Sequence, residues 1–138
     1  MDILKRFGVS MEQSLLQRFD SFIKRKSYKN RSEAIRDLIR ELLVEEEWVE
    51  GGKDVAGAII MVYDHHKREL VDKIVDIQHD FHDIIISSQH VHLDHHMCLE
   101  VVTVKGDINK VFELESKLKS IKGVKHTSLA RSTLGKEL

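Results

Sequence analysis

The 138-residue sequence predicts an α+β protein made of two small domains, and three observations support this prediction. The amino-terminal third holds a short alternating segment and two amphipathic helical patterns. The pair Gly51-Gly52 then interrupts the pattern, as expected of a hinge. The remaining residues alternate between strand and helix periodicity in the order βαββαβ. We therefore place the domains at residues 1–48 and 53–138.

The first element is a predicted strand at residues 5–11. Polar and apolar side chains alternate along it, which puts them on opposite faces. The apolar face comprises Phe7, Val9 and Met11, and the other face comprises Arg6, Gly8 and Ser10. A single strand has no sheet partner within its own domain. The simplest solution is an intertwined two-fold dimer, in which strands of two chains pair as an antiparallel ribbon.

Two amphipathic helices are expected after this strand. Ser10 and Gln13 fit a capping box for the first helix, which is expected to end near Ser27. Asn30 is expected to cap the second helix, with Glu33 at its third position. Each helix carries a single apolar stripe, so one side of each should be buried.

The second domain is predicted to be a ferredoxin-like split βαβ unit. Its strands are expected at residues 55–63, 84–93, 98–105 and 124–130, and its helices at residues 67–81 and 108–121. Gly106-Asp107 and Lys122-Gly123 supply two of its turns. Small sheets of this kind often regulate or oligomerise, but the fold alone does not give the function.

Composition restricts the class of protein. Hydrophobic residues make up 41% of the chain, which is enough for a packed core and excludes a disordered protein. One cysteine excludes an intrachain disulfide and suits a reducing cytoplasm. No apolar run approaches membrane-spanning length, and the first residues do not resemble a signal peptide. We therefore expect a cytoplasmic protein without a membrane partner.

The net charge of −1 hides an uneven distribution. Residues 1–44 contain ten Lys and Arg against six Asp and Glu, so the amino-terminal third is basic. A basic region in a balanced chain indicates a polyanionic partner. A solvated helix surface is an alternative that charge alone does not exclude.

The densest chemical signal is a histidine-rich tract that ends at the only cysteine. His90 and His92 are two residues apart on a predicted strand, so their side chains share one face. Cys98 opens the next strand, and cross-strand neighbours lie close enough to share one ion. Two imidazoles and a thiolate suit nickel, copper or zinc. Surface histidines without a metal are the alternative.

A fourth ligand is needed to close such a site, and we choose His79 from the predicted helix at residues 67–81. The other histidines near this tract and in the last strand are expected to be solvated or secondary. They are His65, His66, His95, His96 and His126.

The order strand, helix, helix in a two-fold dimer resembles that of the ribbon-helix-helix repressors, over about residues 3–47. The sharpest match is Asn-Arg-Ser-Glu-Ala-Ile-Arg at residues 30–36. The resemblance implies that the paired strands enter the major groove of duplex DNA with Arg6, Gly8 and Ser10 toward the bases. Gly8 replaces the polar residue common at that position, so its side chain forms no base-edge hydrogen bond.

The same resemblance suggests a phosphate contact at the start of the second helix. Backbone N–H groups near Arg31 and Ser32 are expected to hold a phosphate there. A plain dimerisation module without DNA is the alternative.

Three motifs behind this module extend the resemblance to essentially the whole chain. They are Gln-His at 78–79, His-x-His followed by five residues and Cys at 90–98, and Leu-Glu at 99–100. Together they resemble the nickel-responsive regulators of the NikR family. The resemblance implies one square-planar nickel ion per chain, bound by His90, His92 and Cys98 of one chain and His79 of a neighbour. Glu100 would accept a hydrogen bond from a ligand imidazole and orient it.

The family also implies further contacts and an assembly. Its sensing domains are ACT-like and form a homotetramer, with a DNA-binding dimer at each end. Glu33 and Asp37 would form a weaker cation site, although an exposed acidic pair beside Arg36 and Arg40 is nearly as good an interpretation. Two further cations match family positions that touch DNA phosphate, and on composition alone they are ordinary helix-start cations. They are Lys67 and Arg68.

The resulting hypothesis is a repressor, not an enzyme, that binds a palindromic operator when nickel is present and acts on nickel uptake. A metalloenzyme would need an open metal position and a general base. A metal store would have no use for the amino-terminal module, and an amino-acid sensor would have no need for the His and Cys set. Copper would bind such a site more tightly than nickel in solution.

Overall fold

The computed structural model describes residues 2–138 and contains two compact units, the first ending at Glu41 and the second spanning Leu42–Leu138. We describe each unit by itself. Helix α2 (Arg31–Glu50) contributes residues to both. The domain limits 1–48 and 53–138 remain a prediction. No helix in residues 2–138 is both long and apolar enough to span a membrane.

The first unit contains α1 (Gln13–Arg25) and the first half of α2. Asn30 caps α2 as predicted, because its Oδ1 accepts a hydrogen bond from the Glu33 N–H at 2.9 Å. The predicted capping box at Ser10 is wrong. Helix α1 begins later, its N-cap is Glu12, and no side-chain cap hydrogen bond forms there.

The predicted strand at residues 5–11 is not formed in the single chain that the structure describes. Strand hydrogen bonds need a neighbouring strand, and the sheet of the second unit pairs only its own four strands. The apolar side chains of this segment are correspondingly uncovered, with Phe7 73% and Val9 60% exposed. The physical reason for the difference is therefore the missing partner strand.

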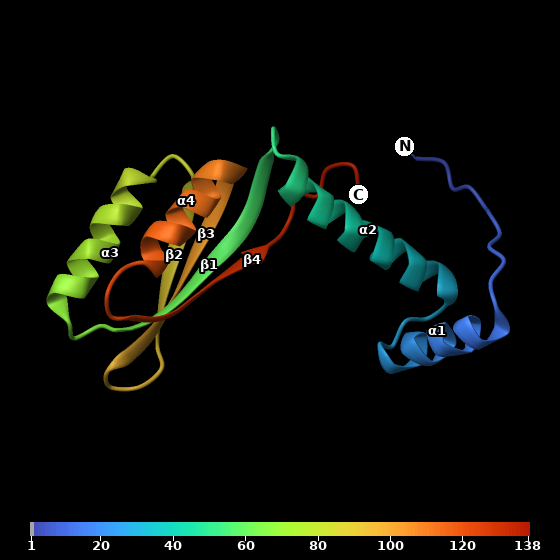
Figure 1. Ribbon diagram of the computed structural model, residues 1–138, viewed down its shortest axis with the longest axis horizontal. Helices are drawn as coiled ribbons and strands as arrows, with labels where there is room; N and C mark the ends of the chain where they lie inside the picture. The colour runs from blue at the N-terminus through green and yellow to red at the C-terminus, as the bar shows by residue number, and fades with distance from the viewer. Residues whose placement is uncertain (1) are drawn as a thin grey trace. The chain divides into compact units, whose positions relative to one another are not determined.

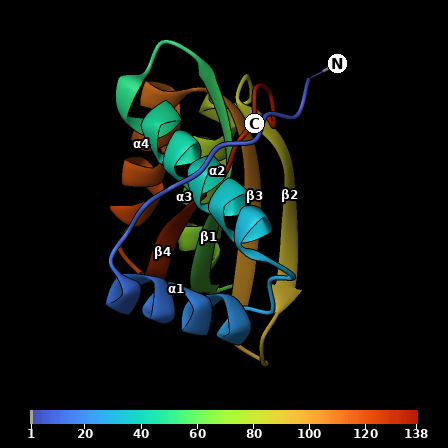
Figure 2. The ribbon, with the colours of Figure 1, turned by 90° about the vertical axis from the view of Figure 1, so that its right-hand side faces the viewer.

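The second unit confirms the predicted ferredoxin-like topology. Its strands are β1 (Asp54–Asp64), β2 (Ile85–His92), β3 (Met97–Asp107) and β4 (Val124–Arg131), and its helices are α3 (Arg68–Asp80) and α4 (Ile108–Lys119). The sheet order is β2-β3-β1-β4, and every neighbouring pair is antiparallel. Figure 1 shows α3 and α4 on one side of the sheet, and Figure 2 shows β2 and β4 at its edges.

Alternation along the two central strands builds the core of this unit. Every second residue of β1, and of β3 as far as Val104, is buried, and α3 and α4 cover these side chains with Ile74, Leu114 and Leu118. The edge strand β2 is exposed along nearly its whole length after Ile85. The polar residues of β2 therefore lie in solvent, next to the buried residues of β3. The candidate site lies where these two strands pair.

Candidate metal centre and nucleic-acid interface

The antiparallel pair β2 and β3 aligns the candidate metal ligands. His92 lies opposite Cys98, and His90 lies opposite Glu100. Directly opposed residues of an antiparallel pair point to the same face of a sheet. The two imidazoles, the thiol and the carboxylate therefore lie on the same face of the sheet. This is the face against which α3 packs. The exposed edge supplies the histidines, while the central strand buries Cys98 and Glu100 to 1% exposure.

Glu100 accepts hydrogen bonds from three neighbouring side chains. Tyr63 Oη donates to its Oε1 at 2.6 Å, Ser88 Oγ donates to its Oε2 at 2.8 Å, and Gln78 Nε2 also donates to Oε2. His90 Nε2 lies 3.3 Å from the Glu100 Oε1 atom. A buried carboxylate is costly unless its oxygens are paired, and these four neighbours pair them. The arrangement gives the carboxylate a fixed position from which it can orient the His90 imidazole.

Burial also governs the thiol and the phenol of this cluster. Removal from water raises the pKa of Cys98, and the neighbouring Tyr63 hydroxyl offsets part of this effect. The pKa of Tyr63 is raised well above its usual value, first by burial and then by its hydrogen bond to Glu100. Cys98 is thus a protonated thiol at neutral pH without a metal, and binding a metal ion there requires the loss of a proton.

The structure does not assemble all four predicted ligands in one chain. His79 lies exposed near the end of α3, where its ring centroid is 6.1 Å from that of His82. His90 turns toward Glu100 and Tyr63. Among residues 2–138, the group of ligand atoms that lie within 4.8 Å of one another is a different one. The assignment of His79, His90, His92 and Cys98 as ligands therefore remains a prediction.

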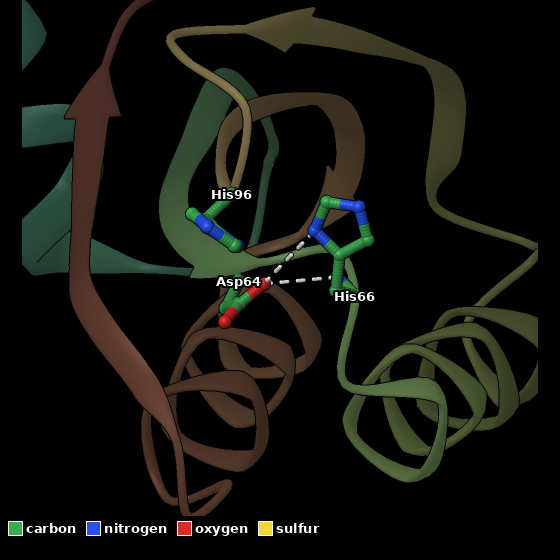
Figure 3. Close-up of side chains that lie close together, drawn as sticks. All are labelled: Asp64, His66 and His96. Atoms are coloured by element: carbon green, nitrogen blue, oxygen red, sulfur yellow. Dashed lines mark hydrogen bonds and ion pairs between the residues drawn. The ribbon is translucent and has the colours of Figure 1, made fainter.

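That different group, which the sequence interpretation set aside, is Asp64, His66 and His96 (Figure 3). Asp64 ends β1, and it lies opposite Met97 at the start of β3. The turn that follows β1 therefore meets the turn that precedes β3. The sequence signal for this group is the occurrence of two histidine pairs, His65-His66 and His95-His96. Only the register of β1 with β3 brings these two pairs together.

The predicted DNA-contacting segment is exposed in the described chain. Arg6, Gly8 and Ser10 lie in residues 2–12, which carry no regular secondary structure. At the start of α2, the Arg31 guanidinium pairs with Asp20 through two contacts of 2.9 Å. This hydrogen bonding lowers the pKa of Asp20. The first-turn N–H groups of Arg31 and Ser32 lack intrahelical partners, as in any α-helix.

The remaining predicted cations are exposed, whereas the predicted acidic pair is half-buried. Lys67 is the N-cap of α3 and Arg68 is its first residue, and both are exposed. Glu33 and Asp37 line a shallow depression of the first unit together with Tyr28, Arg36 and Arg40. Tyr28 donates a hydrogen bond to Asp37, and this bond raises the pKa of Tyr28. Two arginines line the same depression. Glu33 and Asp37 can therefore be interpreted either as a cation site or as an acidic pair beside arginines.

Comparison with known proteins gives matches along nearly the whole chain. Residues 56–132 match the family described as NikR C terminal nickel binding domain, and residues 5–46 match the family described as ribbon-helix-helix protein, copG family. A protein of Syntrophus aciditrophicus named as a nickel-responsive regulator is 57% identical over 135 residues, covering 98% of each chain. A protein of Thermococcus onnurineus with the same description is 50% identical and also covers 98% of each chain.

One solved structure supports the fold of the second unit at low sequence identity. An uncharacterized protein from Thermotoga maritima superposes with a TM-score of 0.52 at 16% identity, covering 57% of this chain and 98% of that one. An ACT domain from the GTP pyrophosphokinase of Chlorobium tepidum gives a TM-score of 0.48 at 19% identity, covering 56% of this chain and 99% of that one.

Proposed function

The chain belongs to the NikR family of nickel-responsive regulators, and from this premise we propose that it is a nickel-dependent repressor of nickel uptake. Proteins of this family are transcriptional regulators, not enzymes, and combine a DNA-binding domain with a nickel-binding domain. The proposal adds the direction of regulation, the ligands and the assembly, which is a homotetramer with one nickel ion per chain.

The observation that supports the proposal most strongly is the β2 and β3 hairpin. It brings two imidazoles and a thiol to one face of the sheet, with His92 directly opposite Cys98. Imidazole and thiolate ligands suit a borderline-soft ion such as nickel. The residues present therefore fit the metal that the family binds. When bound, the ion would join this hairpin to a fourth ligand, His79, of another chain.

The carboxylate of Glu100 orients one of the proposed metal ligands. Its hydrogen bonds to Tyr63, Gln78 and Ser88 hold it in place, so that it can accept a hydrogen bond from the His90 imidazole. A fixed acceptor sets the tautomer and the orientation of a ligand histidine. Gln78 is the residue before His79, so the carboxylate is also connected to the helix that supplies the fourth ligand.

The amino-terminal segment supplies the DNA contacts. The exposed apolar residues of this segment would be covered if it paired with the same segment of a second chain. Such pairing would bury Phe7 and Val9 and leave Arg6 and Ser10 on the outer face. Arginine can donate two hydrogen bonds to guanine, and a serine hydroxyl can bond to either type of base. Two such dimers would recognise a palindromic operator, while Lys67 and Arg68 contact its phosphates.

Regulation follows from linkage between the two sites. A ligand shared between chains favours the assemblies in which His79 of one chain reaches the hairpin of another. If one of these assemblies also spaces the DNA-binding dimers to fit two half-sites, metal and operator affinities increase together. The effect on DNA binding can be no larger than the difference in metal affinity between the assemblies.

The experiment is a duplex-binding titration with defined metals. The nickel-loaded protein selects a duplex from a random-sequence library, and fluorescence anisotropy then measures its affinity with no metal, nickel, zinc or copper. We expect tight binding with nickel and much weaker binding without metal. Sequence-selective binding that is equal with and without nickel would contradict the proposal, and failure to bind any duplex would favour a metal store.

A further inference from the structure

Three metal-ligating side chains converge at the loop end of the sheet, outside the His90, His92 and Cys98 set (Figure 3). Asp64, His66 and His96 each offer one ligand atom, and these atoms all lie within 4.8 Å of one another. Asp64 comes from the end of β1, His66 from the turn before α3, and His96 from the turn between β2 and β3. The cluster is a separate group that uses none of the predicted nickel ligands.

Backbone hydrogen bonds hold the two turns of this cluster together. The His65 N–H donates to the His96 carbonyl oxygen at 3.0 Å and so joins the turns directly. Asp64 Oδ1 accepts from the His66 N–H at 2.9 Å, and Asp94 Oδ1 accepts from the His96 N–H at 2.8 Å. One backbone hydrogen bond and two hydrogen bonds to aspartate carboxylates therefore hold the three ligand-bearing positions before any ion binds.

The spacing of the ligand atoms suits a small divalent ion. Bonds from zinc to imidazole nitrogen and carboxylate oxygen are about 2.0–2.2 Å, so ligand atoms around one tetrahedral ion lie about 3.3–3.6 Å apart. Asp64 Oδ1 and His66 Nδ1 are 3.7 Å apart, and side-chain rotations that move the ligand atoms by about 1 Å would bring all three into range. His66 is 47% exposed and Asp64 17% exposed, so an ion can enter from solvent and retain water in its open positions.

The donor set selects the class of ion. Two imidazoles with one carboxylate suit first-row transition metals, whereas magnesium and calcium take oxygen ligands almost exclusively. We propose that Asp64, His66 and His96 form a second, solvent-open transition-metal site that takes a divalent ion such as nickel or zinc. This proposal goes beyond the regulatory function and does not depend on it.

The neighbouring rings place this site beside the predicted nickel ligands without merging the two. The His65 ring lies between them, 4.3 Å from the His66 ring and 4.8 Å from the His92 ring by centroid distance. His95 is also close, with its ring centroid 5.1 Å from that of His66. Because His95 could replace one imidazole after a single substitution, the test removes two ligands at once.

The test uses the full chain with the thiol site disabled by Cys98→Ala. Equilibrium dialysis against micromolar zinc, and separately nickel, is followed by metal analysis. We expect this protein to retain a bound ion that Asp64→Asn combined with His96→Ala removes. The matched control on the same background is His82→Ala combined with His126→Ala, two exposed histidines outside the cluster, and it should retain the ion. Equal retention by both double variants would overturn the proposal.

A second measurement separates this site from the predicted nickel site. In the chain with Cys98 intact, Asp64→Asn combined with His96→Ala should keep the thiolate-to-nickel absorption band, and circular dichroism should show an unchanged fold. Loss of the band in a folded double variant would mean that the two clusters act as one site, and this would also overturn the proposal.

Discussion

Replacing Glu100 by glutamine tests the role of the buried carboxylate. The side chain keeps its size but loses its charge, and one of its oxygens becomes an NH2 group. The three donors can adapt to this change, because the Tyr63 and Ser88 hydroxyls rotate and the Gln78 amide can flip. The cost in folding stability should therefore be about 1 kcal/mol, within the range for one altered hydrogen bond.

The effect of Glu100→Gln on nickel should be larger than its effect on folding. The pair with His90 loses its charge, and with it the acceptor that orients the imidazole. Substitutions of such supporting carboxylates typically lower metal affinity by roughly 10–100-fold. That corresponds to about 1.4–2.7 kcal/mol of binding free energy. Glu100→Ala is a poorer test, because it would leave buried donors unpaired and endanger the fold.

Competition with a chelator of known affinity, followed through the thiolate-to-nickel band, measures this change. Thermal unfolding monitored by circular dichroism measures the change in folding stability caused by Glu100→Gln. Glu69→Gln is the matched control, because its carboxylate is exposed and only pairs with Lys73 on α3. A folded Glu100→Gln protein that binds nickel within about twofold of the unsubstituted chain would refute the role that we assign to Glu100.

Three further outcomes follow from the same account. Mixing His79→Ala protein with Cys98→Ala protein should restore some nickel sites with a thiolate band, whereas ligands confined to one chain would give none. Arg6→Ala should cost roughly 1–3 kcal/mol of binding free energy on the selected operator and less on unrelated DNA. Lys67→Ala should weaken binding to all duplexes alike and reduce its salt dependence. Anisotropy titrations at several salt concentrations distinguish the two effects. In the metal-free protein, burial and a raised pKa should make Cys98 react with a thiol reagent more slowly than free cysteine, and the rate should increase with pH; rapid labelling at neutral pH would contradict the described environment.

The sequence was sufficient to predict the second unit because its signals are local. Alternation along 55–63 and 98–105 and the glycine-containing turns mark two strands, and the structure extends each of them by one or two residues at both ends. The first unit was predicted less well. Its predicted strand finds no partner strand in the described chain, and Ser10 does not cap α1 because the helix begins at Gln13 behind Glu12.

The candidate site shows the same division between local and long-range information. The pairing of His92 with Cys98 follows from a hairpin whose strands and turn can be recognised in the sequence. The contacts of Glu100 with Tyr63 and Gln78 bring together three separate elements, and the sequence pattern does not specify which elements pack together. The cluster at Asp64 was missed for this reason, since it depends on the register between β1 and β3.

Nickel affinity measured with and without the operator duplex tests the central claim most directly, because linkage requires the effect to be reciprocal. If the metal site and the DNA-binding segments are coupled as proposed, saturating duplex will raise nickel affinity by the same factor by which nickel raises operator affinity. Cys98→Ala should abolish this mutual effect while leaving weak, salt-sensitive binding to DNA. A nickel affinity that is identical with and without the duplex would contradict the claim that nickel regulates DNA binding.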